Sequence, residues 1–130
     1  MQQIPLTKSF TIEHEMPDGT KVSGNFVTHK LTMLEKVKVG VIKSRLTSGT
    51  LYDADTKSGL SALYDDYAEA IANCQVALTE KPNWFDPENM TDDSLLWKVY
   101  REVAALETAI FRRVLEKAAA IKNKDKPQGS

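Results

Sequence analysis

The chain has 130 residues, of which 42% are hydrophobic and 27% charged, so one globular domain with its own core is expected. A net charge of -1 gives no general attraction for nucleic acid, and no apolar run reaches the roughly 18 residues of a membrane span. With two histidines, one cysteine and no phosphate-binding glycine loop, we expect no metal, no cofactor and no enzymatic site.

Two segments near the N-terminus, SFTIEHE and TKVSGNFVT, alternate apolar and polar residues and predict a β-hairpin over about residues 8–29. A two-residue turn would pair apolar with polar residues across the strands. A three-residue loop at residues 17–19 instead places Phe10 opposite Phe26 and gives one mostly apolar face. We predict this second register, and because two strands are not stable alone, we expect the hairpin to lie on helices or to pair with a strand of a neighbouring chain.

A first helix is predicted from Thr32, because Thr32 and Glu35 match a capping box. Ser48 and Gly49 predict its end. Apolar residues at helical spacing share one side of this helix: Leu34, Val37, Val41, Ile42 and Leu46. The following segment, TLYDADTKSG, is expected to be a polar connection.

A second helix is predicted from about Ser58 to a point before Pro82, which cannot continue it. Its apolar stripe is the clearest so far and consists of Leu60, Leu63, Tyr64, Tyr67, Ile71, Cys74 and Leu78. Cys74 has no histidine or basic residue one turn away, so we expect a buried, unreactive thiol.

The segment KPNWFDPENM places Trp84 and Phe85 between two prolines, where neither helix nor strand continues easily. Large exposed apolar patches are uncommon on soluble monomers, so packing is favoured over display. We expect both rings to fill the corner between the second and third helices, and Trp97 to stack against the same corner.

A third helix is predicted to be capped at Thr91 and to run to about Lys122. Its stripe consists of Leu95, Leu96, Val99, Tyr100, Val103, Leu106, Ile110, Phe111, Val114 and Leu115. At about 1.5 Å per residue the helix would be roughly 45 Å long, more than a domain of this size can cover. Its far end is therefore expected to project or to meet another chain, and Val114, Leu115 and Ile121 are candidate partner-binding residues.

The predicted fold is mainly α: a three-helix bundle-like domain over residues 1–121 with an appended N-terminal β-hairpin. The charged tail at residues 122–130 lacks apolar anchors and is expected to be disordered. His14 and His29 are expected to lie too far apart to share a metal, with His14 at the edge of the hairpin's apolar face. Arg112, Arg113 and the lysines of KAAAIKNKDK form a basic end of the third helix that could contact nucleic acid or an acidic protein partner. The favoured interpretation is that they are cations placed at a helix C-terminus.

Four short patterns occur in order over about residues 10–115: xDGxxxxGxF, LTxxE, PxW and DDxLLxxVYxEVxxxExxxF. In this order and spacing they resemble the small tail assembly chaperones of long-tailed bacteriophages of the siphophage type. The matching residues are Asp18, Gly19, Gly24, Phe26, Leu31, Thr32, Glu35, Pro82, Trp84, Asp92, Asp93, Leu95, Leu96, Val99, Tyr100, Glu102, Val103, Glu107 and Phe111.

The resemblance implies a protein without enzymatic activity that binds the tape measure protein, keeps it soluble and helps recruit tail tube subunits. It also implies self-association as a homo-oligomer, action in the host cytoplasm and absence from the finished virion. Many members of this family are also made as a longer frameshifted product. The absence of a signal-peptide pattern and the single cysteine agree with a cytoplasmic setting.

Two other functions stay open at this point. One is a structural head-tail connector or tail completion protein that is retained in the virion. The other is a small DNA-binding regulator, against which stand the near-neutral charge and the lack of a short basic recognition helix.

Overall fold

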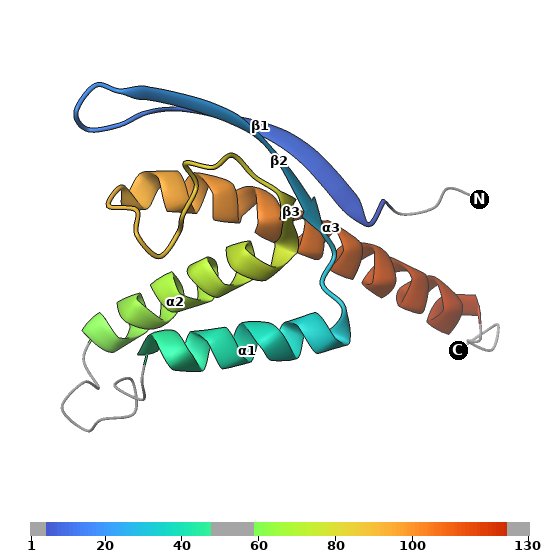
Figure 1. Ribbon diagram of the computed structural model, residues 1–130. Coiled ribbons are helices and arrows are strands. Elements are labelled where there is room, and N and C mark those ends of the chain that lie inside the picture. The colour runs from blue at the N-terminus through green and yellow to red at the C-terminus, as the bar shows by residue number, and fades with distance from the viewer. Residues whose placement is uncertain (1–4, 48–58, 125–130) are drawn as a thin grey trace.

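The computed structural model of the protein describes residues 5–47 and 59–124. Its elements in chain order are β1 (Thr7–Glu15), β2 (Lys21–His29), α1 (Met33–Thr47), α2 (Gly59–Ala77), β3 (Leu78–Glu80) and α3 (Asp93–Lys124). The strands form one antiparallel sheet in the order β1-β2-β3. In Figure 1 the sheet lies over α3, α3 packs on α2, and α2 packs on α1.

The hairpin has the predicted register, with Phe10 opposite Phe26. The Met16 amide donates to the Thr20 carbonyl at 2.7 Å, and the Gly19 amide donates to the Met16 carbonyl at 2.9 Å. Gly19 has a φ of 89°, in the left-handed region that an L side chain rarely adopts. The prediction of a three-residue loop with glycine in its left-handed position is therefore confirmed.

The sheet has a third strand that the sequence did not predict. Helix α2 ends at Ala77, and the next three residues pair with β2 as β3, so the assignment of Leu78 to the second helix is wrong. Pairing with β3 occupies backbone groups at one end of β2 that would otherwise form a free sheet edge. The sheet is thus tied to the C-terminal end of α2 as well as to α3.

The core beneath the sheet is aromatic. Phe10 stacks on Phe26 with ring centroids 5.1 Å apart, and the edge of Phe85 meets Phe26 at 5.3 Å. Phe85 is completely buried, whereas Trp84 is half-buried and its indole N–H donates to the Ser23 carbonyl at 3.3 Å. Both rings pack against the hairpin, which places them at the meeting point of loop and sheet rather than between two helices alone.

Helix α2 is the middle layer and is packed through small side chains. Its buried residues are Ala68, Ala70, Ala72, Cys74 and Ala77. Small side chains let α1 and α3 approach it closely from two sides. Leu63 and Tyr64 of the predicted stripe are exposed, which corrects that part of the prediction, and the side chain of Leu60 lies outside the described residues.

Helix α1 begins with the predicted capping box. The Glu35 amide donates to Thr32 Oγ1 at 3.1 Å, and the Thr32 amide donates to Glu35 Oε1 at 3.0 Å. The side facing the core overlaps the predicted stripe only in part. Ile42 packs against the core and Leu46 is half-buried, but Val39 is buried while Val37 and Val41 are exposed. Leu34 is exposed too, since α1 packs on α2 along a narrow line and leaves its other apolar side uncovered.

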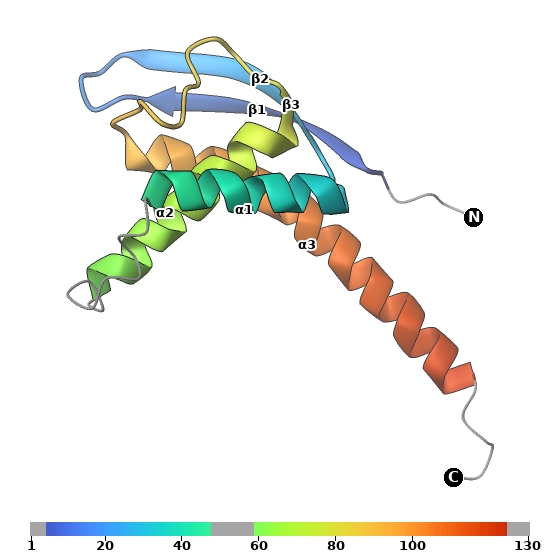
Figure 2. The ribbon, with the colours of Figure 1, turned by 60° about the horizontal axis from the view of Figure 1, so that its bottom comes forward.

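Helix α3 is capped by Asp92 and not by Thr91, because Asp92 Oδ1 accepts a hydrogen bond from the Ser94 amide at 3.0 Å. Its buried residues end at Ile110, and every side chain at residues 111–122 is exposed. Figure 2 shows this half extending away from the other elements, which confirms the prediction of a projecting end. The helix continues to Lys124, so the start of the predicted disordered tail is helical, and residues 125–130 lie outside the described part.

Candidate interaction surfaces

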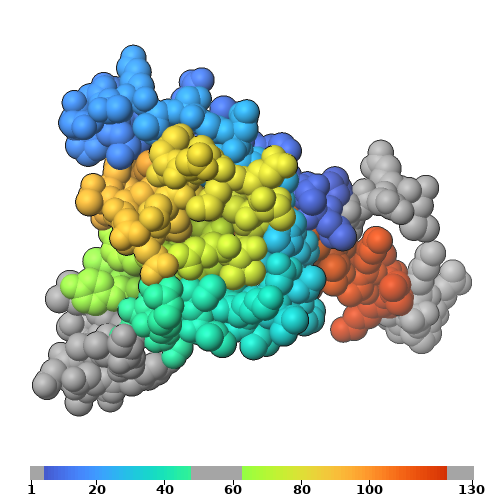
Figure 3. Space-filling view, in the orientation of Figure 1, coloured from blue at the N-terminus to red at the C-terminus, as the bar shows by residue number. Residues whose placement is uncertain are grey.

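The projecting half of α3 carries an exposed apolar stripe, called the distal stripe below. It consists of Phe111, Val114, Leu115 and Ile121, whose exposed fractions are 62%, 54%, 52% and 63%. Residues three and four apart share one side of a helix, so these side chains form one surface and not four isolated positions. In Figure 3 the orange-red end of α3 stands at the border of the molecule, apart from the teal and yellow surface of the body. An apolar run of this kind is typical of an interaction site.

A second exposed apolar surface lies on α1, on the side turned away from the helix it packs against. This α1 stripe consists of Met33, Leu34, Val37 and Val41, which are 77%, 65%, 62% and 65% exposed. The sheet and α1 lie at opposite ends of the layered structure (Figure 1). The α1 stripe therefore lies across the molecule from the hairpin.

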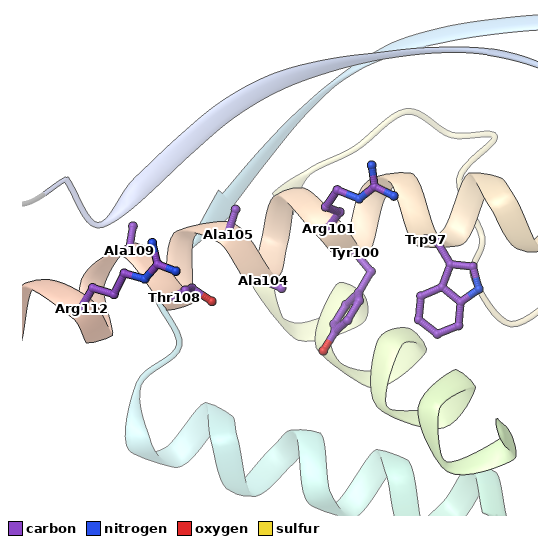
Figure 4. Close-up of a pocket in the computed structure, with 8 residues that line it drawn as sticks. All are labelled: Trp97, Tyr100, Arg101, Ala104, Ala105, Thr108, Ala109 and Arg112. Atoms are coloured by element: carbon purple, nitrogen blue, oxygen red, sulfur yellow. The ribbon is translucent and has the colours of Figure 1, made fainter. Parts of the chain in front are cut away.

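A groove of about 690 Å³ runs along the first half of α3, beside the line where α3 packs on α2. Its lining is Trp97, Tyr100, Arg101, Ala104, Ala105, Thr108, Ala109 and Arg112. Figure 4 shows Trp97 at one end and Arg112 at the other, with short side chains between them. The hollow exists because the four small residues of the lining come after its two large aromatic ones along α3.

A polar cluster joins β1 to the start of α3. The Nε2 atom of His14 lies 2.7 Å from Asp92 Oδ2, and Lys98 Nζ lies 2.8 Å from His14 Nδ1. An ammonium group can only donate, so Nδ1 accepts and the proton on Nε2 is donated to Asp92. Hydrogen bonds from Ser94, and then from His14, lower the pKa of Asp92 to about 2.

This cluster has the residue types of a Ser-His-Asp triad without its geometry. In a triad the acid and the serine meet opposite nitrogens of the ring. Here both Asp92 and Ser94 lie on the Nε2 side of His14, and the Ser94 hydroxyl donates to Asp92 Oδ1 at 2.6 Å. The hydroxyl is therefore not activated, and the arrangement clasps the hairpin to the α3 N-terminus.

His29 lies at the other end of the hairpin and joins the capping box of α1. Its Nε2 atom is 2.7 Å from Glu35 Oε2, while its buried Nδ1 has no partner among the described residues. The hydrogen bond from the Thr32 backbone amide, and then the one with the His29 side chain, lower the pKa of Glu35. Within residues 5–47 and 59–124, no three metal-ligating side chains come together.

Cys74 is completely buried, and burial raises the pKa of its thiol to about 12.

Trp97 does not reach the corner at which it was expected. Its ring lies 5.4 Å from that of Tyr67 and 6.0 Å from that of Tyr100, so it joins α3 to α2. The two tryptophans, Trp84 and Trp97, thus belong to different contacts, one with the sheet and one with α2.

Sequence reasoning identified Val114, Leu115 and Ile121, and the structure places all three on the projecting half of α3. The α1 stripe was visible as a pattern but was assigned to a packed side. The groove was missed because alanine and threonine give no amphipathic signal, although the run Ala104, Ala105, Thr108 and Ala109 on one side of a helix is a usable sign of close approach.

Comparisons with protein-family models, with curated proteins and with solved structures found no match for the chain. None of the helices in the described ranges is long and apolar enough to cross a membrane.

Proposed function

We propose that the protein is a tail assembly chaperone of a long-tailed bacteriophage, which binds the tape measure protein, keeps it soluble and helps recruit tail tube subunits. The distal stripe is the observation that carries this proposal. Under this proposal, the helices and the appended hairpin form a bundle-like body, and the projecting half of α3 binds the partner. The chaperone acts in the host cytoplasm, self-associates and leaves before the virion is complete.

The physical support comes from the exposure of the distal stripe. Four large apolar side chains, each more than half exposed, lie on a helix that nothing in the described chain covers. Burial of apolar surface contributes about 25 cal/mol per Å², so covering this stripe favours association. An amphipathic helix of a partner is the usual occupant of such a surface, and a tape measure protein, which is largely helical, supplies such helices.

The test is co-expression of the tagged protein with the tape measure protein encoded nearby in its source genome. We expect the tape measure protein to become soluble and to co-elute. A variant with Val114→Ser, Leu115→Ser and Ile121→Ser should lose this effect while its circular dichroism spectrum stays unchanged, because all three side chains are exposed. The matched control carries Met33→Ser, Val37→Ser and Val41→Ser, which removes an equal number of exposed apolar side chains from α1.

If the tape measure protein still co-elutes with the distal-stripe variant but not with the α1 variant, the binding surface is on α1. No solubilisation by the unaltered protein would contradict the chaperone function. Mass spectrometry of purified virions separates the structural alternative, since a connector or tail completion protein is present in finished particles and a chaperone is not.

A further inference from the structure

The groove and the distal stripe are parts of one surface. Residues 97, 101, 104, 108, 111, 115 and 118 are separated alternately by four and three positions, so they follow one side of α3 as the seam of a coiled coil does. The seam passes from Trp97 through the short side chains of Ala104 and Thr108 to Phe111 and Leu115. At about 1.5 Å per residue it is roughly 30 Å long, enough for a second helix to lie along it.

Two unpaired arginines flank the hollow part of this surface. Arg101 and Arg112 are both exposed, and within residues 5–47 and 59–124 neither guanidinium has a hydrogen bond or an ion pair. The lysines nearby are engaged, since Lys8 pairs with Glu102 at 2.6 Å and Lys30 with Glu107 at 2.8 Å. The two arginines therefore leave unpaired positive charge at both ends of the hollow part of the groove, in a chain whose net charge is -1.

The spacing of the two arginines sets the spacing of a complementary partner. They are 11 residues apart, which is about three helical turns and roughly 16 Å. A guanidinium binds a carboxylate through two parallel hydrogen bonds, so two carboxylates at the same spacing on a partner helix match this pair. The short side chains between the arginines allow such a helix to approach closely.

We propose that residues 97–118 of α3 form a docking site for an amphipathic helix of another protein, whose apolar stripe carries carboxylates about three turns apart. This inference rests on the proposed function, since it names the kind of tape measure segment that the chaperone binds. A second copy of this chain fits less well, because pairing two α3 helices brings four arginines into one interface. The described carboxylates of α3 near these arginines are already paired, Glu102 and Glu107 with lysines of the hairpin region and Glu116 with Arg113.

The first test uses the full-length protein and a synthetic helical peptide of about 18 residues, with a leucine stripe and two glutamates 11 positions apart. The matched peptide has glutamines in their place. By fluorescence anisotropy at low ionic strength, the glutamate peptide should bind about tenfold more tightly, and the difference should shrink in about 1 M salt. Equal affinities of the two peptides would overturn the proposal.

The second test changes the protein. A variant with Arg101→Glu and Arg112→Glu should bind the glutamate peptide at least tenfold more weakly and prefer a third peptide with lysines at the two positions. Arg113→Glu, a single charge reversal on a different side of α3, should leave both preferences unaltered, whereas Arg112→Glu alone should weaken binding of the glutamate peptide. Thr108→Trp, which fills the hollow at an exposed position, should weaken the binding of all three peptides.

The outcomes separate this site from the proposed function. If the tape measure protein co-elutes equally well with the Arg101→Glu, Arg112→Glu variant, the docking site is wrong and the chaperone function stands. If co-elution fails with the unaltered protein while the glutamate peptide binds, the function is wrong and the site stands. If sedimentation shows a dimer that Thr108→Trp dissociates and that excludes the peptide, a second copy occupies the surface and the proposal is wrong.

Discussion

Both halves of α3 carry apolar residues at helical spacing, but their surroundings are opposite. Residues 93–110 place Leu95, Val99 and Val103 against the sheet and α2, where each is at most 2% exposed. Residues 111–122 carry Phe111, Val114, Leu115 and Ile121, yet all their side chains are exposed. One continuous helix therefore holds the body together with its first half and presents a bare apolar surface with its second. Whether an apolar residue of α3 is buried therefore depends on its position along the helix relative to the body, because apolar residues occur in both halves.

The largest expected difference in stability is between two variants that each lose one phenylalanine, one from the buried core and one from the distal half of α3. Phe85→Ala should lower the free energy of unfolding by about 3–5 kcal/mol, because it empties a fully buried site against Phe26. Phe111→Ala should change it by no more than about 0.5 kcal/mol, since that ring is 62% exposed. Chemical denaturation of both variants measures the two values. Similar losses would show that the distal half is covered in solution.

Alanine substitutions at two glycines should change the stability by smaller amounts and in opposite directions. A Cβ at Gly24 would clash with the Pro82 ring and lie 3.1 Å from Trp84 Cζ2, so Gly24→Ala should cost about 1–3 kcal/mol. A Cβ at Gly40 has no heavy atom within 4 Å, and Gly40→Ala in the middle of α1 should stabilise the protein by about 0.5–1 kcal/mol. Thermal denaturation compares them. A stabilising Gly24→Ala would mean that the 81–92 loop does not rest on the hairpin as described.

Substitution of Asp92 tests the polar contact between the hairpin and the N-terminus of α3. Asp92→Ala removes the cap of α3 and the partner of His14, and should lower Tm by a few degrees. Glu116→Ala, which loses only an exposed pair with Arg113 on the distal half, should leave Tm unchanged. The folded-state pKa of Asp92, about 2, lies below its ordinary value of 3.8. Its contribution is therefore present above pH 3.8 and is lost as the pH falls through about 2.

A thermal scan of the unaltered protein and Asp92→Ala from neutral pH to about pH 2 checks that direction. The gap between their Tm values should close on acidification. A gap that widens instead would mean that the carboxylate is not the form that stabilises the clasp.

The parts of the fold that were predicted depend on residues close together in the chain. The capping box joins Thr32 to Glu35, and the hairpin register follows from the loop that ends at Gly19. These signals are complete within a few positions. The projecting end followed from helix length alone, which is why Val114, Leu115 and Ile121 could be named from the sequence.

What was missed depends on segments that are distant in the chain. Strand β3 forms because β2 offers an edge about 50 residues earlier, and local periodicity had extended α2 through Leu78. The buried side of α1 could not be chosen because the helix is apolar on two sides, and α2 covers only the one that contains Val39. Trp97 was assigned by nearness in sequence to Trp84, whereas its actual neighbour, Tyr67, comes from α2.

The smallest effect should come from removing the outer part of the distal half. Deletion of residues 114–130 should change the free energy of unfolding by no more than about 0.5 kcal/mol, because every described side chain it removes is exposed. The helical circular dichroism signal should fall in proportion to the helix removed. A larger loss of stability, growing with protein concentration, would show that copies of the chain cover one another's distal stripe. If removing this segment leaves the free energy of unfolding unchanged, its apolar residues do not stabilise the rest of the chain. We then expect them to serve a contact outside the chain.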